Sequence, residues 1–162
     1  MKMRIIITGG TFDKHYDEIK GRLTFKGTHL PEILKRIRCT APISLEINQL
    51  IDSLEMKDKN RKKILESCRN AKEKNIVITH GTDTMIETAK VLGTADLGKV
   101  IVLTGAMIPY AIAQSDAVFN LGCAISAAQL LDPGVYVAMN GQIFCWNNVR
   151  KNYNDGVFER IE

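Results

Sequence analysis

Residues 75–84 of the chain read NIVITHGTDT, and this stretch decides the fold. The run Asn75–Ile78 is too short for a helix and rich in β-branched residues, which is typical of a buried strand. Met85, Ala89 and Leu92 then recur at helical spacing. A strand, a glycine turn and a helix start therefore follow one another within a few residues. In an open parallel sheet, ligands bind at this place, beyond the carboxyl ends of the strands.

The same order occurs at the front of the chain, where the run Met3–Ile7 precedes the turn Thr8–Thr11. Both turns carry hydroxyl groups, and they would be neighbours if their strands were adjacent. Hydroxyl groups beside backbone N–H donors suit acyl transfer, in which a nucleophile attacks a carbonyl carbon and the oxygen becomes charged. The glycine patterns of nucleotide-binding loops are Gly-x-Gly-x-x-Gly and Gly-x(4)-Gly-Lys-Ser/Thr. Neither is present, so we do not expect a nucleotide site.

The composition indicates one core and excludes several classes of protein. The chain has 162 residues, 45% of them hydrophobic, and a formal net charge of +4, which fits a single domain. Basic residues gather between Lys57 and Lys63 in a probable helix, which we interpret as a solvated face. No aromatic residues are interleaved with them as in a nucleic-acid patch, so we expect no nucleic-acid partner.

The chain has no apolar run of membrane-spanning length and no signal-peptide pattern, so we expect a cytoplasmic protein without membrane contact. The four cysteines have neither metal-ligand spacing nor a Cys-x-x-Cys pattern. We expect each of them to be a small apolar residue of the core with a reduced thiol.

The remaining segments predict an α/β fold with a parallel sheet, an antiparallel strand at its edge and helices on both faces, hence three layers. We expect strands over residues 3–7, 44–51, 75–78, 99–103 and 135–139. We expect helices over residues 29–37, 57–74 and 115–131, and a further helix from Thr84 with Glu87 in a capping box. Asn140-Gly141 predicts a hairpin turn. The polar stretch 12–21, with a short hairpin after it, is a candidate lid over the strand ends.

Four blocks of the sequence resemble the bacterial-type L-asparaginases in residues, order and spacing. These blocks are Thr8–Thr11, His80–Met85, Leu103–Met107 and Asp116–Leu121. The resemblance runs from Met3 to about Tyr153 and corresponds to the larger N-terminal domain of that family. It implies one domain over residues 1–162, with the C-terminal domain of the two-domain enzymes absent.

The resemblance implies hydrolysis of the side-chain amide of L-asparagine to aspartate and ammonia, without metal or cofactor. Thr11 matches the nucleophile of the family, and Thr82, Asp83 and Lys151 match its further catalytic residues. Tyr16 is the candidate for the tyrosine that assists the nucleophile, with Tyr110 as the alternative. The substrate-binding residues are then Ser53, Gly10, Gly81 and Asp83.

Each of these residues also has an ordinary structural role. Thr11 and Ser53 suit turns and helix caps, and Lys151 alone would be a surface lysine. His80 precedes a glycine at a strand end, and we interpret it as a packed, hydrogen-bonded histidine.

Three functions are compatible with the sequence. The first is an amidohydrolase acting on an amino-acid amide. The second is a non-catalytic relative that binds an amino acid or a protein partner, and the third is the ammonia-supplying subunit of an amidotransferase. We expect a homo-oligomer, a dimer or a tetramer, because two-domain relatives assemble their sites between subunits.

Overall fold

A six-stranded sheet forms the centre of the computed structural model, which describes residues 2–161. Its strands, in spatial order, are β4 (Ile43–Ile51), β1 (Met3–Gly9), β5 (Asn75–Thr79), β6 (Val100–Thr104), β7 (Gly134–Met139) and β8 (Gln142–Cys145). The first five are parallel, and β8 pairs antiparallel with β7. The predicted parallel sheet with an antiparallel edge strand is therefore confirmed.

The two threonine-bearing turns follow adjacent strands. Strand β1 pairs with β5 in a register that places Ile5 beside Val77 and Ile7 beside Thr79. All of β5 is buried, as expected for a β-branched strand covered on both faces. Because the strands are parallel and end side by side, the turns after Gly9 and Thr79 leave the sheet at the same edge.

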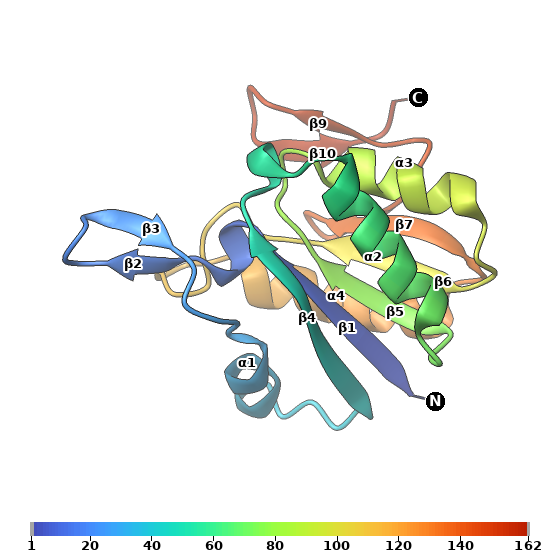
Figure 1. The fold of residues 1–162 in the computed structure, drawn as a ribbon, viewed down its shortest axis with the longest axis horizontal. Helices are drawn as coiled ribbons and strands as arrows, with labels where there is room; N and C mark the ends of the chain where they lie inside the picture. The colour runs from blue at the N-terminus through green and yellow to red at the C-terminus, as the bar shows by residue number, and fades with distance from the viewer. Residues whose placement is uncertain (1, 162) are drawn as a thin grey trace.

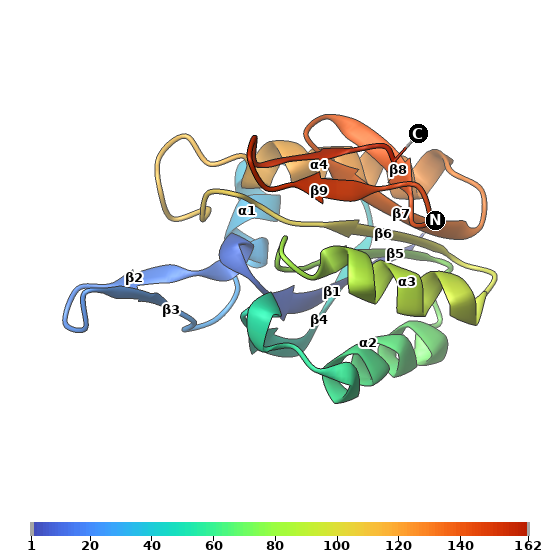
Figure 2. The same cartoon turned by 90° about the horizontal axis from the view of Figure 1, so that it is seen from above.

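Helices cover both faces of the sheet (Figures 1 and 2). Helices α2 (Asp58–Asn70) and α3 (Met85–Ala95) pack on one face in a core that contains Ile64, Ile78 and Leu92. Helices α1 (Leu30–Arg36) and α4 (Ala117–Leu130) bury the other face, in a core that contains Ile33 and Leu121. No described helix is long and apolar enough to cross a membrane.

Two hairpins lie outside the main sheet. Strands β2 (His15–Asp17) and β3 (Arg22–Thr24) form a hairpin that projects away from the sheet in both views (Figures 1 and 2). Strands β9 (Arg150–Asn152) and β10 (Val157–Glu159) form another near the C-terminus. Two short 3₁₀ turns, Thr11–Asp13 and Ser53–Glu55, follow β1 and β4.

Three sequence predictions are wrong in detail. Helix α2 ends at Asn70 rather than 74, because the Lys99 ammonium caps its last turn by donating to the Cys68 and Ala71 carbonyl groups. Thr84 is the N-cap of α3, but its hydroxyl donates to the Ser53 carbonyl, so no capping box with Glu87 forms.

The third correction concerns the cysteines. Cys68 is buried as predicted, whereas Cys39 and Cys123 are partly exposed and Cys145 is exposed. Cys145 ends the short edge strand β8, whose first and last residues are both exposed.

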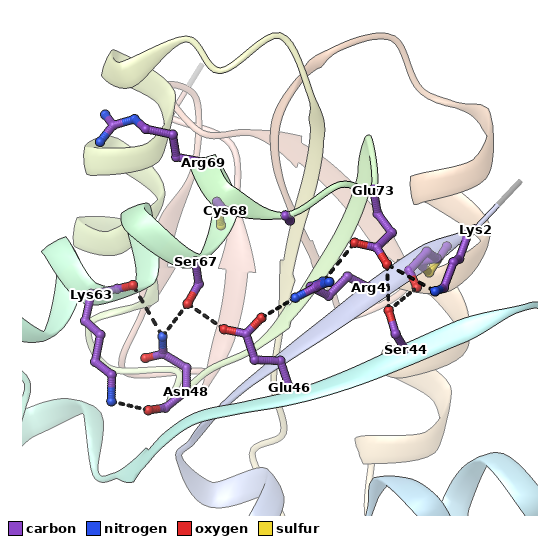
Figure 3. Close-up of polar contacts among 12 residues, drawn as sticks. Lys2, Arg4, Ser44, Glu46, Asn48, Lys63, Ser67, Cys68, Arg69 and Glu73 are labelled. Carbon is purple, nitrogen blue, oxygen red and sulfur yellow. Dashed lines mark hydrogen bonds and ion pairs between the residues drawn. The ribbon is translucent and has the colours of Figure 1, made fainter.

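A charged network ties β1, β4 and the end of α2 together at the opposite edge of the sheet (Figure 3). Arg4 donates to Glu46 at 2.7 Å and to Glu73 at 2.9 Å. The hydrogen bond from Arg4 lowers the pKa of Glu73 to about 2. A cavity of about 760 Å³ lies beside this network, lined by Lys2, Arg4, Asn70, Lys72, Glu73, Lys74 and Asn75. It lies at the starts of β1 and β5, one strand length from the threonine turns.

Candidate active site

Three turns touch one another at the carboxyl edge of the sheet. A Cβ atom placed on Gly10 would overlap the backbone N and Cα of Gly81. A Cβ atom on Gly81 would lie 2.5 Å from the Oγ of Ser53. The exits of β1, β5 and β4 therefore adjoin only because both central positions are glycine. Thr11 and Thr82 directly follow these two glycines, so the backbone segments that carry them are adjacent.

Thr82, Asp83 and Lys151 form one hydrogen-bonded group. The Nζ of Lys151 donates to the Thr82 hydroxyl oxygen at 2.9 Å and to the Asp83 carboxylate at 2.6 Å. The side chain of Lys151 is only 6% exposed, so the ammonium depends on these two partners for most of its solvation. Because Lys151 donates to the Thr82 oxygen, the hydroxyl hydrogen of Thr82 is free for another acceptor.

Thr11 has a free hydroxyl group on the turn that adjoins Gly81. It begins the 3₁₀ turn after β1 and is partly exposed. Within residues 2–161, its side chain makes no hydrogen bond to the protein. A hydroxyl group that is accessible and not held by other residues is available to a ligand.

An ion pair links the first turn to the exit of β4. The Lys14 ammonium donates to the Asp52 carboxylate at 2.5 Å. Burial acts to raise the pKa of Asp52, but the hydrogen bonds from Lys14 and from the Leu54 N–H outweigh it and the pKa is lowered. The charged pair thus holds the segment after Thr11 against the turn that carries Ser53, which is itself buried.

The two tyrosines considered from the sequence lie elsewhere. Tyr16 is on β2 of the projecting hairpin, paired with Leu23, and is 59% exposed. Tyr110 packs against the ring of His29 and bonds to Glu32 and Arg36 on α1. The structure therefore brings neither tyrosine to the Thr82–Lys151 group, and Tyr16 could reach it only by movement of the hairpin.

His80 has a structural role, in agreement with the sequence interpretation. Its Nδ1 lies 2.8 Å from the Gly81 carbonyl, which can only accept, so Nδ1 carries the proton and Nε2 accepts from the Thr88 hydroxyl at 2.8 Å. Burial lowers the pKa of His80 to about 4, and the imidazole is neutral at pH 7. Its hydrogen bond to the Gly81 carbonyl holds the backbone of this turn in place.

Sequence reasoning missed the hairpin that presents Lys151 and also missed Tyr153. Strands β9 and β10 have three residues each and lie in a polar tail, so periodicity gave no signal. Asp155-Gly156 between them is a hairpin signal that could have found the pair. The Tyr153 hydroxyl donates to the Asp83 carbonyl at 3.2 Å.

The arrangement contains the parts needed for acyl transfer. Two hydroxyl groups are carried by adjoining turns, and one of them is bonded to a buried ammonium. Turns of this kind also present backbone N–H groups. Such groups can attack a carbonyl carbon, move a proton and stabilise an oxyanion. Within residues 2–161, no group of three or more His, Cys, Asp or Glu side chains is arranged to hold a metal ion.

Comparison with known proteins identifies relatives over almost the whole chain. A family described as Asparaginase, N-terminal, matches residues 2–158. The chain is 30% identical to L-asparaginase 1 of Escherichia coli strain K12 over 162 residues, which cover 94% of this chain and 48% of that protein. It is 32% identical to a glutamyl-tRNA(Gln) amidotransferase subunit of Pyrococcus abyssi over 148 residues, which cover 87% of this chain and 34% of that protein.

Among solved structures, the thermostable L-asparaginase from Thermococcus kodakarensis superposes with a TM-score of 0.84 at 29% identity. The match covers 99% of this chain and 51% of that chain. The chain thus spans about a third to a half of the length of these relatives.

Proposed function

The chain belongs to the asparaginase family, and we propose that it hydrolyses the side-chain amide of L-asparagine to aspartate and ammonia. The observation that carries this proposal is the contact of Lys151 with both Thr82 and Asp83, on a turn that adjoins the one bearing Thr11. The fold alone would allow many functions, whereas this group of side chains suits the attack of a hydroxyl on an amide.

In the proposed reaction, the Thr11 oxygen bonds to the amide carbon and the C–N bond breaks. The nitrogen leaves as ammonia, and water then cleaves the ester and restores the hydroxyl. Thr82, polarised by the Lys151 ammonium, donates its free hydrogen to the leaving nitrogen. Lys151 resupplies the proton to Thr82, and the proton that Thr11 gives up restores the ammonium. The Gly10 N–H donates to the Ile51 carbonyl, so the oxyanion is stabilised by other backbone N–H groups near the Gly10–Thr11 and Thr82 turns.

Asp83 and Ser53 bind the amino-acid end of the substrate in this proposal. The Asp83 carboxylate is about one third exposed and still has an oxygen free of Lys151, so it can accept hydrogen bonds from an α-ammonium group. Ser53 lies against Gly81 and marks the side on which an α-carboxylate would be bound. We assign the role of a mobile lid to the β2–β3 hairpin, whose closure would carry Tyr16 towards Thr11.

Ammonia release from L-asparagine by the purified protein tests the proposal. We expect Thr11→Ala and Lys151→Met each to lower kcat by on the order of 100-fold or more, as for loss of a nucleophile or proton-transfer group. Thr94→Ala is the matched control, because its hydroxyl bonds only to the backbone of its own helix. Wild-type release that is no faster than that of Thr11→Ala at millimolar asparagine would disprove the proposal.

A second candidate function is the supply of ammonia to a partner enzyme. The similarity to an amidotransferase subunit at 32% identity favours it. A subunit of this kind would release ammonia from asparagine or glutamine only weakly until its partner is added. Stimulation of ammonia release by a co-purifying protein would therefore support this function over a free-standing asparaginase. Binding of aspartate in a calorimeter without turnover of any amide would instead indicate a non-catalytic relative.

A further inference from the structure

Tyr153 contacts the candidate active site at two points although its side chain lies at the surface. It is 68% exposed, two residues beyond Lys151 in the turn between β9 and β10. Its hydroxyl donates to the Asp83 carbonyl at 3.2 Å, and the Lys151 ammonium stands over its ring, 5.0 Å from the centroid. An exposed tyrosine on a turn ordinarily has no such fixed position.

The contact between ammonium and ring supplies a third partner for Lys151. An ammonium has three N–H groups, and those of Lys151 have Thr82 and Asp83 as hydrogen-bond acceptors. An aromatic face attracts a cation within about 6 Å of its centroid. The ring is thus a third favourable contact for an ammonium whose side chain is only 6% exposed.

The hairpin that presents Lys151 needs such a contact because it lies outside the main sheet. Its base is fixed by the buried Phe158, whose N–H donates to the Asn140 side chain at 2.8 Å. Its tip, around Asn154 and Asp155, is exposed. The hydrogen bond from Tyr153 to the Asp83 backbone connects the tip side of the hairpin to the turn after β5. This bond and the ring contact together hold the hairpin in place, so loss of both would let Lys151 move relative to Thr82.

We propose that Tyr153 is a positioning residue that holds the Lys151 ammonium against Thr82 and Asp83. Its ring acts on the ammonium, and its hydroxyl fixes the ring. Burial, followed by the neighbouring Asp83 and Glu87 carboxylates, raises the pKa of Tyr153, so the phenol keeps its proton as the hydrogen bond requires. The consequence for catalysis rests on the proposed hydrolysis, whereas the placement of Lys151 does not.

Two substitutions separate the ring from a general structural role. Tyr153→Leu removes the ring and the hydroxyl, and we expect kcat for asparagine to fall about five- to tenfold with KM changed by less than about twofold. Tyr153→Phe keeps the ring, and its kcat should stay within about threefold of wild type. Tyr136→Leu, which removes an aromatic ring near the start of β7 at the opposite end of the sheet, should leave kcat unchanged.

A second measurement does not depend on turnover. Acylation of lysine amines by an N-hydroxysuccinimide ester, followed by mass spectrometry, reports how well Lys151 is shielded. Its rate should rise several-fold in Tyr153→Leu but not in Tyr153→Phe, while the exposed Lys74 reacts equally in all variants.

The proposal is overturned if Tyr153→Leu leaves both kcat and Lys151 acylation at wild-type values, or if Tyr153→Phe loses as much kcat as Tyr153→Leu. If wild-type protein hydrolyses no asparagine, the proposed function fails and the acylation rates alone decide the role of Tyr153.

Discussion

At the scale of single residues, the close approach of Gly10 to Gly81 sets the geometry of the site. Gly10 has a φ of +72° and also lacks room for a Cβ atom, so two independent constraints fall on one position. Gly21, in the projecting hairpin, has a similar φ of +61° but no atom within 4 Å of where its Cβ would be. Gly10 combines a ψ of −174°, which at positive φ is a glycine-only conformation, with a steric overlap, whereas Gly21 has the positive φ and no overlap.

We therefore expect Gly21→Ala to destabilise the protein by about 1 kcal/mol, the cost of the left-handed conformation alone. Gly10→Ala adds an overlap with backbone atoms that side-chain rotation cannot relieve, so its cost should be about 2–4 kcal/mol. Urea unfolding of both variants measures the difference. Equal losses would show that the turns do not touch as described.

Asp13, two residues after Thr11, has a strongly perturbed carboxyl group. Burial is the main cause that raises its pKa to about 6 from 3.8, although the His29 N–H and the Thr28 hydroxyl donate to it and act in the opposite direction. The unfolded chain ionises first as the pH rises from 3.8, so folding stability falls between pH 4 and 6 and stays lower above that range.

Asp13→Asn removes this pH dependence, because an amide does not ionise. The free energy of unfolding of the variant minus that of wild type should therefore be about 1–3 kcal/mol more favourable to the variant at pH 7 than at pH 4. Chemical unfolding at the two pH values tests this. A stability difference from wild type that is the same at both would rule out the perturbed carboxyl group.

At the scale of elements, the parallel strands and the turns after them were predictable, because continuous β-branched runs such as Ile76–Ile78 admit few alternatives. The end of α2 was not predictable, since Lys99, whose ammonium caps its last turn, is distant in sequence. The same holds for the Thr84 hydroxyl, which bonds to the Ser53 carbonyl instead of its own helix.

Of the candidate site, Thr82, Asp83 and Lys151 were named from the resemblance and lie together. The position of Tyr16 depends on the hairpin's orientation, which no local pattern encodes.

Lys99 provides a test of how α2 ends. Its ammonium donates to the Cys68 carbonyl at 2.6 Å and to that of Ala71 at 2.5 Å. Lys99→Met keeps the length of the side chain and removes these bonds, and we expect it to cost about 1–2 kcal/mol of stability. Lys90→Met, an exposed lysine on α3, should cost less than about 0.5 kcal/mol. Thermal unfolding by circular dichroism compares the two.

At the scale of the whole molecule, α4 presents an apolar stripe to the outside. Phe119, Cys123, Ser126 and Leu130 recur at helical spacing, and Leu130 is 84% exposed. A groove of about 320 Å³ beside the stripe is bordered by Ile143 of β8. Exposed apolar surface of this kind is typical of subunit contacts.

We therefore expect a homo-oligomer that uses this stripe, with a mass by light scattering of two or four times 18.1 kDa. Leu130→Lys should reduce the mass towards that of one chain, because a charge in an apolar contact is costly. Ile19→Lys, on the projecting hairpin, is the matched control and should leave the mass unchanged. A wild-type mass of 18.1 kDa at micromolar concentration would contradict the expectation.

The β2–β3 hairpin is inserted between β1 and α1 and projects from the sheet (Figures 1 and 2). Since none of the core strands depends on it, its length and sequence can be exchanged while the scaffold of glycine turns stays intact. Grafting loops of other lengths between Asp17 and Arg22 would therefore change the reach of this hairpin while Tyr16 and the sheet stay in place.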